Sequence, residues 1–371
     1  MPGWSERIQR AWARRGLVSA LLLPLSWLFR GATALRRALY RVGWLRAERL
    51  PVRVVVVGNL IAGGAGKTPT VLALVALLSR HGFRPAIVSR GYGGNTSGPL
   101  AVEADTPART CGDEPLLMRR RAGVPVYVGQ DRTAAIRSVL NDHPQTDVVV
   151  SDDGLQHLRM ARDLQVLVFD ERGAGNGRLL PAGPLREPLP RVVPPASVVL
   201  YNAPVPTTPL PGWTAERRLV GIIALDSWWT DSRPRLESLD VLKGVTVIAA
   251  AGMARPERFF EMLKATGIDV VPLPLADHYD YVTLPWPPSV RTVIVTEKDA
   301  VKLDPARLAS TRVWVAALDF VPAPEFDAAV LRLLGPPAAS PPQNHDGNAP
   351  AEPAGMPDLQ GAAATRPAAD A

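Results

Sequence analysis

The sequence has a single cysteine and no hydrophobic run long enough to cross a bilayer. Among its 371 residues only Cys111 carries a thiol, which excludes an intramolecular disulfide and suits a reducing compartment. The 13 residues 17–29 are mostly apolar but are interrupted by Pro24, whereas a membrane-spanning helix needs about 20 apolar residues. A chain of this length and 47% hydrophobic composition is long enough for two α/β domains with cores of their own.

Net positive charge is absent from residue 51 onward, although the whole chain carries +7. Residues 1–50 hold ten Arg against two Glu, a balance of +8, which leaves −1 for the remainder. This distribution argues against a nucleic-acid-binding surface on the folded part, so we expect no nucleic-acid partner. The basic, Trp-containing segment 1–50 instead predicts one or two amphipathic helices at a membrane interface. An ordinary N-terminal helix packed on the domain is the alternative.

Strand-like apolar segments alternate with helix-length segments over most of the chain, which indicates a parallel sheet covered by helices on both faces. A second series of strands follows Trp228-Trp229, and the Pro/Ala-rich end of the chain is predicted to be disordered. We therefore expect an arm at 1–50, a larger α/β domain at 51–230, a smaller α/β domain at 231–335 and a tail at 336–371.

An apolar strand at 52–57 leads into a glycine-rich turn, then Lys67, Thr68 and an apolar helix. This order is typical of a phosphate-binding loop (P-loop), in which glycine amides surround the phosphates, the lysine reaches the β- and γ-phosphates and the threonine hydroxyl is available to Mg²⁺. The strict motif has glycine where Ile61 stands, and a glycine turn without a ligand is the alternative. The predicted nucleotide-binding residues are Ile61, Ala62, Gly63, Gly64, Ala65, Gly66, Lys67 and Thr68.

A second signal is the pair Asp152 and Asp153 at the end of the apolar run 148–151. The carboxyl edge of the sheet that carries a P-loop is where a Mg²⁺-organising carboxylate is expected. If the strand continues, the two side chains point to opposite faces, so we expect one aspartate to reach the metal or its water shell and the other to face the acceptor side or a helix. The predicted metal-binding set is Thr68, Asp152 and Asp153.

The segment Gly112-Asp113-Glu114-Pro115 precedes a predicted helix. Local sequence favours a helix cap for Asp113, because Asp is a common N-cap and Pro is tolerated in the first turn. The alternative is a carboxylate near the γ-phosphate that takes a proton from an acceptor hydroxyl. Elsewhere, His278 lies beside two aspartates that can hold it in one tautomer, and the loops at 90–94 and 175–188 are typical of binding segments.

Seven segments together resemble the tetraacyldisaccharide 4′-kinase family. They occur in the family's order between about residues 50 and 303: GNLIAGGAGKTP, SRGYGG, GDEP, DDGLQH, GNGRLLPAGPLREP, DHYDY and VTEKDAVK. The resemblance implies an enzyme that uses ATP and Mg²⁺ to phosphorylate lipid A disaccharide 1-phosphate at the cytoplasmic face of the bacterial inner membrane. It also implies that a loop starting at Ile61 is normal for the family.

The same resemblance implies residue roles. Asp113 corresponds to the family's proposed catalytic base and His278 to its partner, which weakens the cap interpretation. Lys67 and Thr68 carry over as phosphate and Mg²⁺ groups, with Asp152 and Asp153 as the metal-side carboxylates. Other positions linked to activity are Arg90, Tyr92, His157, Arg186 and Glu187. The main rival is a membrane-associated P-loop switch or partition-type ATPase. Such proteins often have a lysine early in the glycine loop, whereas here Ala62 precedes Gly63 and Gly64. A GTPase is a weaker rival, because Thr296-Glu297-Lys298-Asp299 only mimics the guanine-reading motif.

Overall fold

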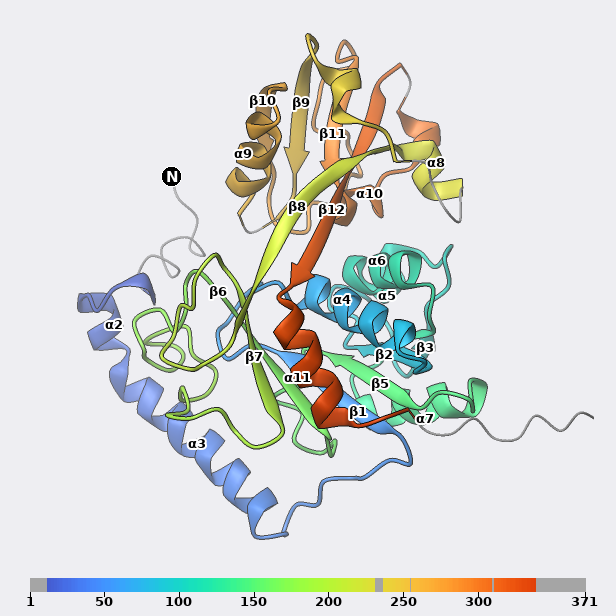
Figure 1. Ribbon diagram of the computed structural model, residues 1–371. Helices are drawn as coiled ribbons and strands as arrows, with labels where there is room; N and C mark the ends of the chain where they lie inside the picture. The colour runs from blue at the N-terminus through green and yellow to red at the C-terminus, as the bar shows by residue number, and fades with distance from the viewer. Residues whose placement is uncertain (1–11, 231–235, 254, 309, 338–371) are drawn as a thin grey trace, which may run out of the picture. The chain divides into compact units, whose positions relative to one another are not determined.

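The computed structural model describes residues 12–230, 236–253, 255–308 and 310–337 (Figure 1). Residues 1–11 of the predicted arm and residues 338–371 of the predicted tail lie outside this description. None of the helices in these ranges is both long enough and apolar enough to span a membrane.

Twelve strands form one sheet in the order β10-β9-β11-β12-β8-β7-β6-β1-β5-β2-β4-β3. Within the part that we call the N-terminal half, every pair is parallel except β3 with β4. Its strands are β1 (Arg53–Gly58), β2 (Pro85–Ser89), β3 (Leu100–Ala101), β4 (Val126–Val128), β5 (Val148–Asp152), β6 (Leu164–Asp170) and β7 (Ser197–Asn202). The predicted mostly parallel α/β fold is confirmed.

The C-terminal half continues the sheet with β9 (Thr246–Ala251), β10 (Asp269–Pro274), β11 (Thr292–Thr296) and the start of β12 (Arg312–Pro322). A two-stranded ribbon of β8 (Trp213–Ala224) and β12 joins the halves (Figure 1). The two strands are antiparallel; Ala224 lies opposite Trp314 at one end, and Ala215 lies opposite Pro322 at the other. Strand β8 pairs with β7 through only two residues, Trp213 and Thr214. The N-terminal half therefore meets the C-terminal half mainly through this ribbon and through side chains.

Helices cover both faces of the N-terminal half, as the continuous apolar strands predict. In β1, Val55 and Val57 pack in the core beneath α4 (Lys67–Arg80), α6 (Asp113–Ala122) and α11 (Pro324–Leu334). Val54 and Val56 face the opposite core, which includes α7 (Arg132–Asp142). Apart from the N-terminal arm, the other helices of the described residues are α5 (Ala108–Cys111), α8 (Leu225–Thr230), α9 (Glu257–Ala265), α10 (Glu297–Ala300) and the 3₁₀ turns η1 (Leu239–Leu242) and η2 (Pro305–Arg307).

The described part of the N-terminal arm forms α2 (Leu17–Leu21) and α3 (Leu23–Arg41). Pro24 lies in the first turn of α3, where its missing N–H costs nothing. One side of α3 is fixed to the domain: Phe29 packs on the core, and Ser26 Oγ donates to the Leu179 carbonyl at 2.9 Å. Large apolar side chains on the rest of the two helices are exposed, including Leu21, Leu25, Trp27, Leu28 and Leu35.

Candidate functional site

The glycine-rich loop between β1 and α4 has the backbone conformation that a P-loop needs. Gly63 and Gly66 adopt φ of 91° and 90°, which favours glycine. A Cβ on Gly66 would also lie 2.3 Å from Asn202 Nδ2. Ile61, the departure from the strict motif, is 1% exposed and belongs to the core, while the next amide, Ala62 N, donates to the Pro184 carbonyl at 2.8 Å. A buried side chain therefore anchors the start of the loop where the strict motif has glycine.

Lys67 is the first residue of α4, and its ammonium lies among polar groups of the sheet edge. Its Nζ is 3.4 Å from Asn59 Oδ1 and 3.7 Å from Asp153 Oδ1. Arg172, which follows β6 and was not predicted, donates to the Gly64 carbonyl at 2.6 Å and to the Ala62 carbonyl at 3.3 Å. These bonds hold the loop's carbonyls outward, which leaves its amide groups for a ligand.

The two aspartates at the end of β5 have separate environments, but strand alternation is not the reason, because the strand ends at Asp152. Asp153 adopts φ of 48° and lies 3.1 Å from Arg186 Nη1, on the same side as Lys67. Asp152 is buried; its Oδ2 accepts from Ser89 Oγ at 3.3 Å, and its Oδ1 has no hydrogen-bond partner within the described ranges. Burial raises the pKa of Asp152 to about 7, and the charge of Glu114 adds to the rise against the opposing effect of Lys67.

Asp152 is thus a buried carboxylate with an unpaired oxygen, and the charges of Lys67 and Arg132 do not fully offset the effect of burial on its pKa. A divalent cation fits this donor set, because carboxylate and hydroxyl oxygens are hard ligands. No group of three or more His, Cys, Asp or Glu residues that would hold a metal occurs in the described ranges. Mg²⁺ beside a nucleotide needs only one or two carboxylates, since phosphates and water complete its coordination.

Asp113 is the first residue of α6, and Gly112 occupies the N-cap position without a side-chain cap. Asp113 is therefore not the N-cap residue that its local sequence alone favours. Its Oδ1 accepts from the adjacent Glu114 N–H at 3.0 Å, and its Oδ2 lies 2.9 Å from His278 Nδ1. His278 adopts φ of 61° in the segment between β10 and β11. Left-handed backbone at a non-glycine residue is costly and typically occurs at functional sites.

Charges around this pair favour an ionised carboxylate next to a protonated imidazole. Burial of Asp113 acts to raise its pKa, but the hydrogen bond with His278 and the charges of Lys298 and Lys302 outweigh it, so the pKa is lowered. The hydrogen bond to Asp113 raises the pKa of His278, despite burial and the charge of Lys298. Lys298 Nζ lies 3.4 Å from Glu114 Oε1 and 3.3 Å from Asp277 Oδ1, and Lys302 Nζ lies 3.9 Å from Asp113 Oδ2.

Tyr92 completes this cluster, because the segments SRGYGG and GDEP interlock. A Cβ on Gly112, whose φ is 94°, would lie 2.5 Å from the Tyr92 carbonyl, and one on Gly94 would lie 2.4 Å from the Thr110 carbonyl. This close backbone approach puts the exposed Tyr92 ring 5.7 Å from the His278 ring. Arg90 is exposed in the same loop, where its charge helps to lower the pKa of the buried Arg132, after the larger effect of burial.

The long Gly/Pro loop links the P-loop side of the site to α3. Arg186 bonds Asp153 and Gln156 Oε1, each at 3.1 Å, while Glu187 pairs with Arg37 of α3 at 2.8 Å. His157 lies outside these contacts: its Nε2 is buried without a hydrogen-bond partner in the described ranges. Burial and the nearby Arg132 lower the pKa of His157, so its ring is neutral at pH 7.

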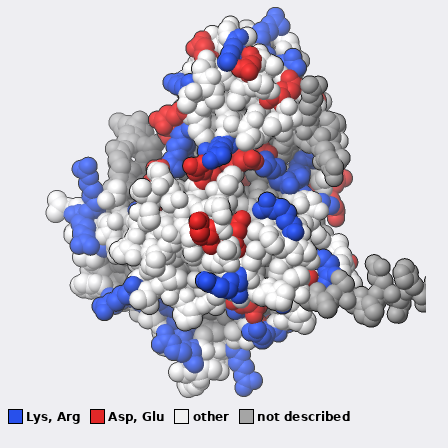
Figure 2. Space-filling model, in the orientation of Figure 1, with Lys and Arg blue, Asp and Glu red and all other residues white. Residues whose placement is uncertain are grey.

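Charged side chains also cross between the two halves of the sheet. Figure 2 shows Lys, Arg, Asp and Glu gathered in a band across the middle of the face in view. Arg255 and Arg258 of the C-terminal half both pair with Glu171, which follows β6.

The basic side chains of Lys298, Lys302 and Arg172 were not assigned roles from sequence. Only the four-residue spacing of the two lysines, which puts them near one another on a helical turn, hinted at a shared environment.

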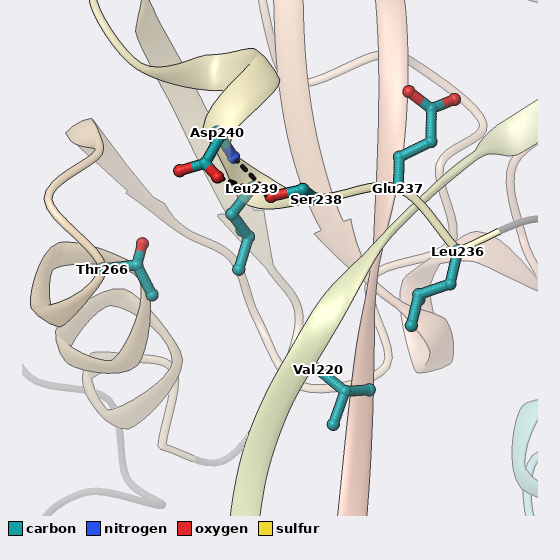
Figure 3. Close-up of a pocket in the computed structure, with 7 residues that line it drawn as sticks. All are labelled: Val220, Leu236, Glu237, Ser238, Leu239, Asp240 and Thr266. Atoms are coloured by element: carbon teal, nitrogen blue, oxygen red, sulfur yellow. Dashed lines mark hydrogen bonds between the residues drawn. The ribbon is translucent and has the colours of Figure 1, made fainter.

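Two pockets lie outside the P-loop. One of about 620 Å³ lies between α3, β6 and the Gly/Pro loop; its floor includes the buried Leu60, Leu155, Met160 and Leu167, and Arg37, Tyr40 and Glu187 also line it. Figure 3 shows the other, of about 390 Å³, and no candidate-site residue lines it. Its lining residues are Val220, Leu236, Glu237, Ser238, Leu239, Asp240 and Thr266.

Comparisons with known proteins agree on one family. The family model "Tetraacyldisaccharide-1-P 4′-kinase" matches residues 18–335. A protein of Leptothrix cholodnii named tetraacyldisaccharide 4′-kinase is 55% identical over 85% of this chain and 92% of its own length. One of the same name from Methylibium petroleiphilum is 52% identical over 89% and 93%. The crystal structure titled as the "apo" form of LpxK from Aquifex aeolicus in complex with ATP superposes with a TM-score of 0.71 at 29% identity, covering 86% of this chain and all of that one.

Proposed function

The chain belongs to the tetraacyldisaccharide-1-phosphate 4′-kinase family, and from this premise we propose that it transfers the γ-phosphate of ATP to the 4′-hydroxyl of tetraacyldisaccharide 1-phosphate, the lipid A precursor. The observation that carries the proposal is the 2.9 Å contact between Asp113 and His278 at the sheet edge that also holds the P-loop. It positions a carboxylate, and the P-loop offers a phosphate site; phosphoryl transfer to a hydroxyl requires both parts.

We infer that the phosphates of ATP bind the amides of the loop from Gly63 to Gly66, with Lys67 neutralising the transferred group. The helix α4 begins at this loop and points the positive end of its dipole at the anion. Arg172 and Asn202 support the loop from outside by bonding the carbonyls of Gly64, Ala62 and Ala65. The loop is thus preorganised before the nucleotide arrives, so little reorganisation is needed during the reaction.

Thr68 and Asp152 are the residues that would hold Mg²⁺, with Asp153 beside them. The unpaired Asp152 Oδ1 supports this assignment, whereas Asp153 is already engaged by Arg186 and Lys67. When bound, the ion neutralises charge on the phosphates and orients them. Asp153 then has a separate task, which is to hold Lys67 and Arg186 on the acceptor side of the phosphates.

Asp113 takes the proton of the 4′-hydroxyl as the bond to phosphorus forms. Its lowered pKa keeps it ionised at neutral pH, so the base is fully available although it is weak. A weak base suffices where the transition state is loose and the proton leaves late. His278 orients Asp113 through Nδ1 and stabilises its charge, and Tyr92 packs on the imidazole. Arg90 shares the loop of Tyr92, whereas His157 lies among Arg132, Asp131 and Arg162; no contact within the described ranges assigns either residue a step.

We infer that the acceptor approaches from the side of α2 and α3, which would rest on the cytoplasmic face of the bacterial inner membrane. The exposed Leu21, Leu25, Trp27, Leu28 and Leu35 support this orientation, because such groups lie in the lipid boundary while arginine binds anionic head groups. The 620 Å³ pocket beside Glu187 opens next to α3, and its apolar floor would receive one acyl chain of the substrate.

A partition-type switch is not favoured by the family match, and one experiment separates it from the kinase. ATP consumption is measured with and without tetraacyldisaccharide 1-phosphate in detergent micelles, and the lipid is analysed for added phosphate. We expect turnover that depends on the lipid and matches phosphate gained by it mole for mole. ATP hydrolysis at the same rate without the lipid would contradict the proposal, as would a preference for GTP.

A further inference from the structure

Helix α6 carries Asp113 at its first residue and three consecutive arginines in its last turn. The helix packs against α4, α5 and β4 of the N-terminal half and also contacts α10 of the C-terminal half. Arg119 stays within that half: its Nε donates to the Val102 carbonyl at 3.0 Å, and its Nη2 lies 3.1 Å from Glu103 Oε2. Arg119 therefore fixes α6 to its own half of the molecule.

Arg120 bonds both halves: its Nη1 donates to the Ala104 carbonyl of the N-terminal half at 3.2 Å, and the guanidinium also reaches α8 at the far end of the ribbon strand β8. Its Nη2 donates to the Trp228 carbonyl at 2.6 Å and to the Trp229 carbonyl at 2.8 Å. Its guanidinium carbon also lies 4.7 Å and 4.4 Å from the centroids of the two indole rings. We call Arg120, Trp228 and Trp229 the arginine clasp. Bonds to two carbonyls and stacking on two rings use the planar fork of arginine, which lysine lacks.

We propose that Arg120 is a positioning residue: the clasp sets the orientation of α6 relative to the C-terminal half, and so brings Asp113 to His278. This inference rests on the proposed function. The Asp113–His278 contact joins the two halves at the first residue of α6, and the clasp joins them seven residues later. Seven residues are two helical turns, or about 10 Å along the axis. Contacts at both ends of a rigid helix define its direction more closely than contacts in its first turn alone, where Lys298 also pairs with Glu114.

The geometry explains why the pair needs such help. The two sheet halves are joined by a ribbon that pairs with β7 through only two residues, so backbone pairing alone holds them loosely. Arg121 adds a second contact on the same turn, with Nη1 2.7 Å from both carboxylate oxygens of Glu297. In that pair the Arg121 side chain is 32% exposed and that of Glu297 12%. The clasp differs from it by adding apolar stacking on two indole rings to its charge-assisted bonds.

The test compares Arg120→Ala, Arg120→Lys and Arg119→Ala in the full chain, with lipid-dependent kinase activity and thermal unfolding measured for each. Arg120→Ala should lower kcat about 10- to 100-fold, as expected for a misplaced base, and change the KM for ATP by less than about twofold. Arg120→Lys should recover part of the loss. Arg119→Ala removes a matched arginine from the same turn and should keep kcat within about twofold of the wild type. If Arg120→Ala does not fold, the kcat values of Arg120→Lys and Arg119→Lys are compared instead.

Two further measurements separate positioning from general destabilisation. In a His278→Ala background, Arg120→Ala should cost much less than it does alone, because the pair that it positions is already broken. The pKa of His278 is followed through its ring resonance by NMR without any lipid. It should be lower in Arg120→Ala than in the wild type and unchanged in Arg119→Ala. A full-size loss in the His278→Ala background, an unchanged His278 titration or an equal loss in Arg119→Ala would each overturn the inference. An inactive wild type with the expected His278 shifts would contradict the proposed function instead.

Discussion

Replacing Asp113 by Asn tests the assignment of the base with little change of shape. The asparagine carbonyl can still accept from the Glu114 N–H, so α6 keeps its start. What is lost is the negative charge that His278 Nδ1 contacts at 2.9 Å and that Lys298 and Lys302 surround. General-base assistance is typically worth about 10²- to 10⁴-fold, or about 3–5 kcal/mol in activation free energy. We expect kcat to fall within this range while the KM for ATP stays nearly constant.

The same variant should change the titration of His278. The hydrogen bond to Asp113 is the largest effect that raises the pKa of His278, and burial and Lys298 both oppose it. Without the carboxylate, the His278 pKa should fall below its ordinary value of about 6.5. Because the folded-state pKa is raised in the wild type, His278 stabilises the fold at low pH and loses this contribution as pH rises through that pKa. Asp113, whose pKa is lowered, stabilises the fold above about pH 4 and loses this contribution as pH falls through its folded pKa.

The assay is a single-turnover measurement with γ-labelled ATP, together with NMR titration of the five histidines. Asp277→Asn is the matched control, because Asp277 lies 3.9 Å from the other ring nitrogen of His278 and is exposed. The control should keep most of kcat and shift the His278 pKa only slightly. A near-normal kcat for Asp113→Asn, or an unchanged His278 pKa, would refute the reasoning.

Three further predictions follow from other parts of the site. Lys67→Ala should reduce turnover by orders of magnitude with little change in unfolding temperature, because Lys67 is at the helix start and not in the core; normal kcat would exclude a P-loop role. Deleting residues 1–40, or introducing Leu28→Glu together with Leu35→Glu, should move the protein from membranes to the soluble fraction. High salt alone should extract the wild type only partly. Unchanged partitioning of these variants would show that the arm is not the anchor. Ala161→Phe should occupy part of the 620 Å³ pocket and lower kcat/KM by about tenfold for long-chain acceptors but not for short-chain ones, with the exposed Val192→Phe as control. Equal effects on both acceptors would remove the pocket from substrate binding.

Sequence patterns predicted the elements whose signals are local. The apolar runs of β1, β5 and β6 and the glycine turn before Lys67 read clearly, because both faces of those strands are buried and the loop needs positive φ at Gly63 and Gly66. Strand β8 was missed. Its sequence, WTAERRLVGIIA, carries Glu216, Arg217 and Arg218 in the ribbon outside the main core, so it lacks the apolar continuity of a central strand.

Contacts between residues far apart in the sequence could not be predicted from local sequence patterns. Asp113 reads as a helix cap in its own segment, and only the resemblance to a known family paired it with His278, 165 residues away. Nothing near Lys298 or Arg172 shows that the first would face Glu114 and Asp277 or that the second would hold the P-loop carbonyls. Such contacts depend on how the two halves of the sheet face each other, which no periodicity encodes.

The most direct test of the account is the position of the transferred phosphate. The protein is incubated with ATP and tetraacyldisaccharide 1-phosphate, and the lipid product is examined by ³¹P–¹H correlation NMR and mass spectrometry. We predict one added phosphomonoester whose phosphorus couples to the proton on carbon 4′, formed by the wild type and nearly absent with Asp113→Asn. Phosphate on any other hydroxyl, or release of inorganic phosphate with an unchanged lipid, would contradict it.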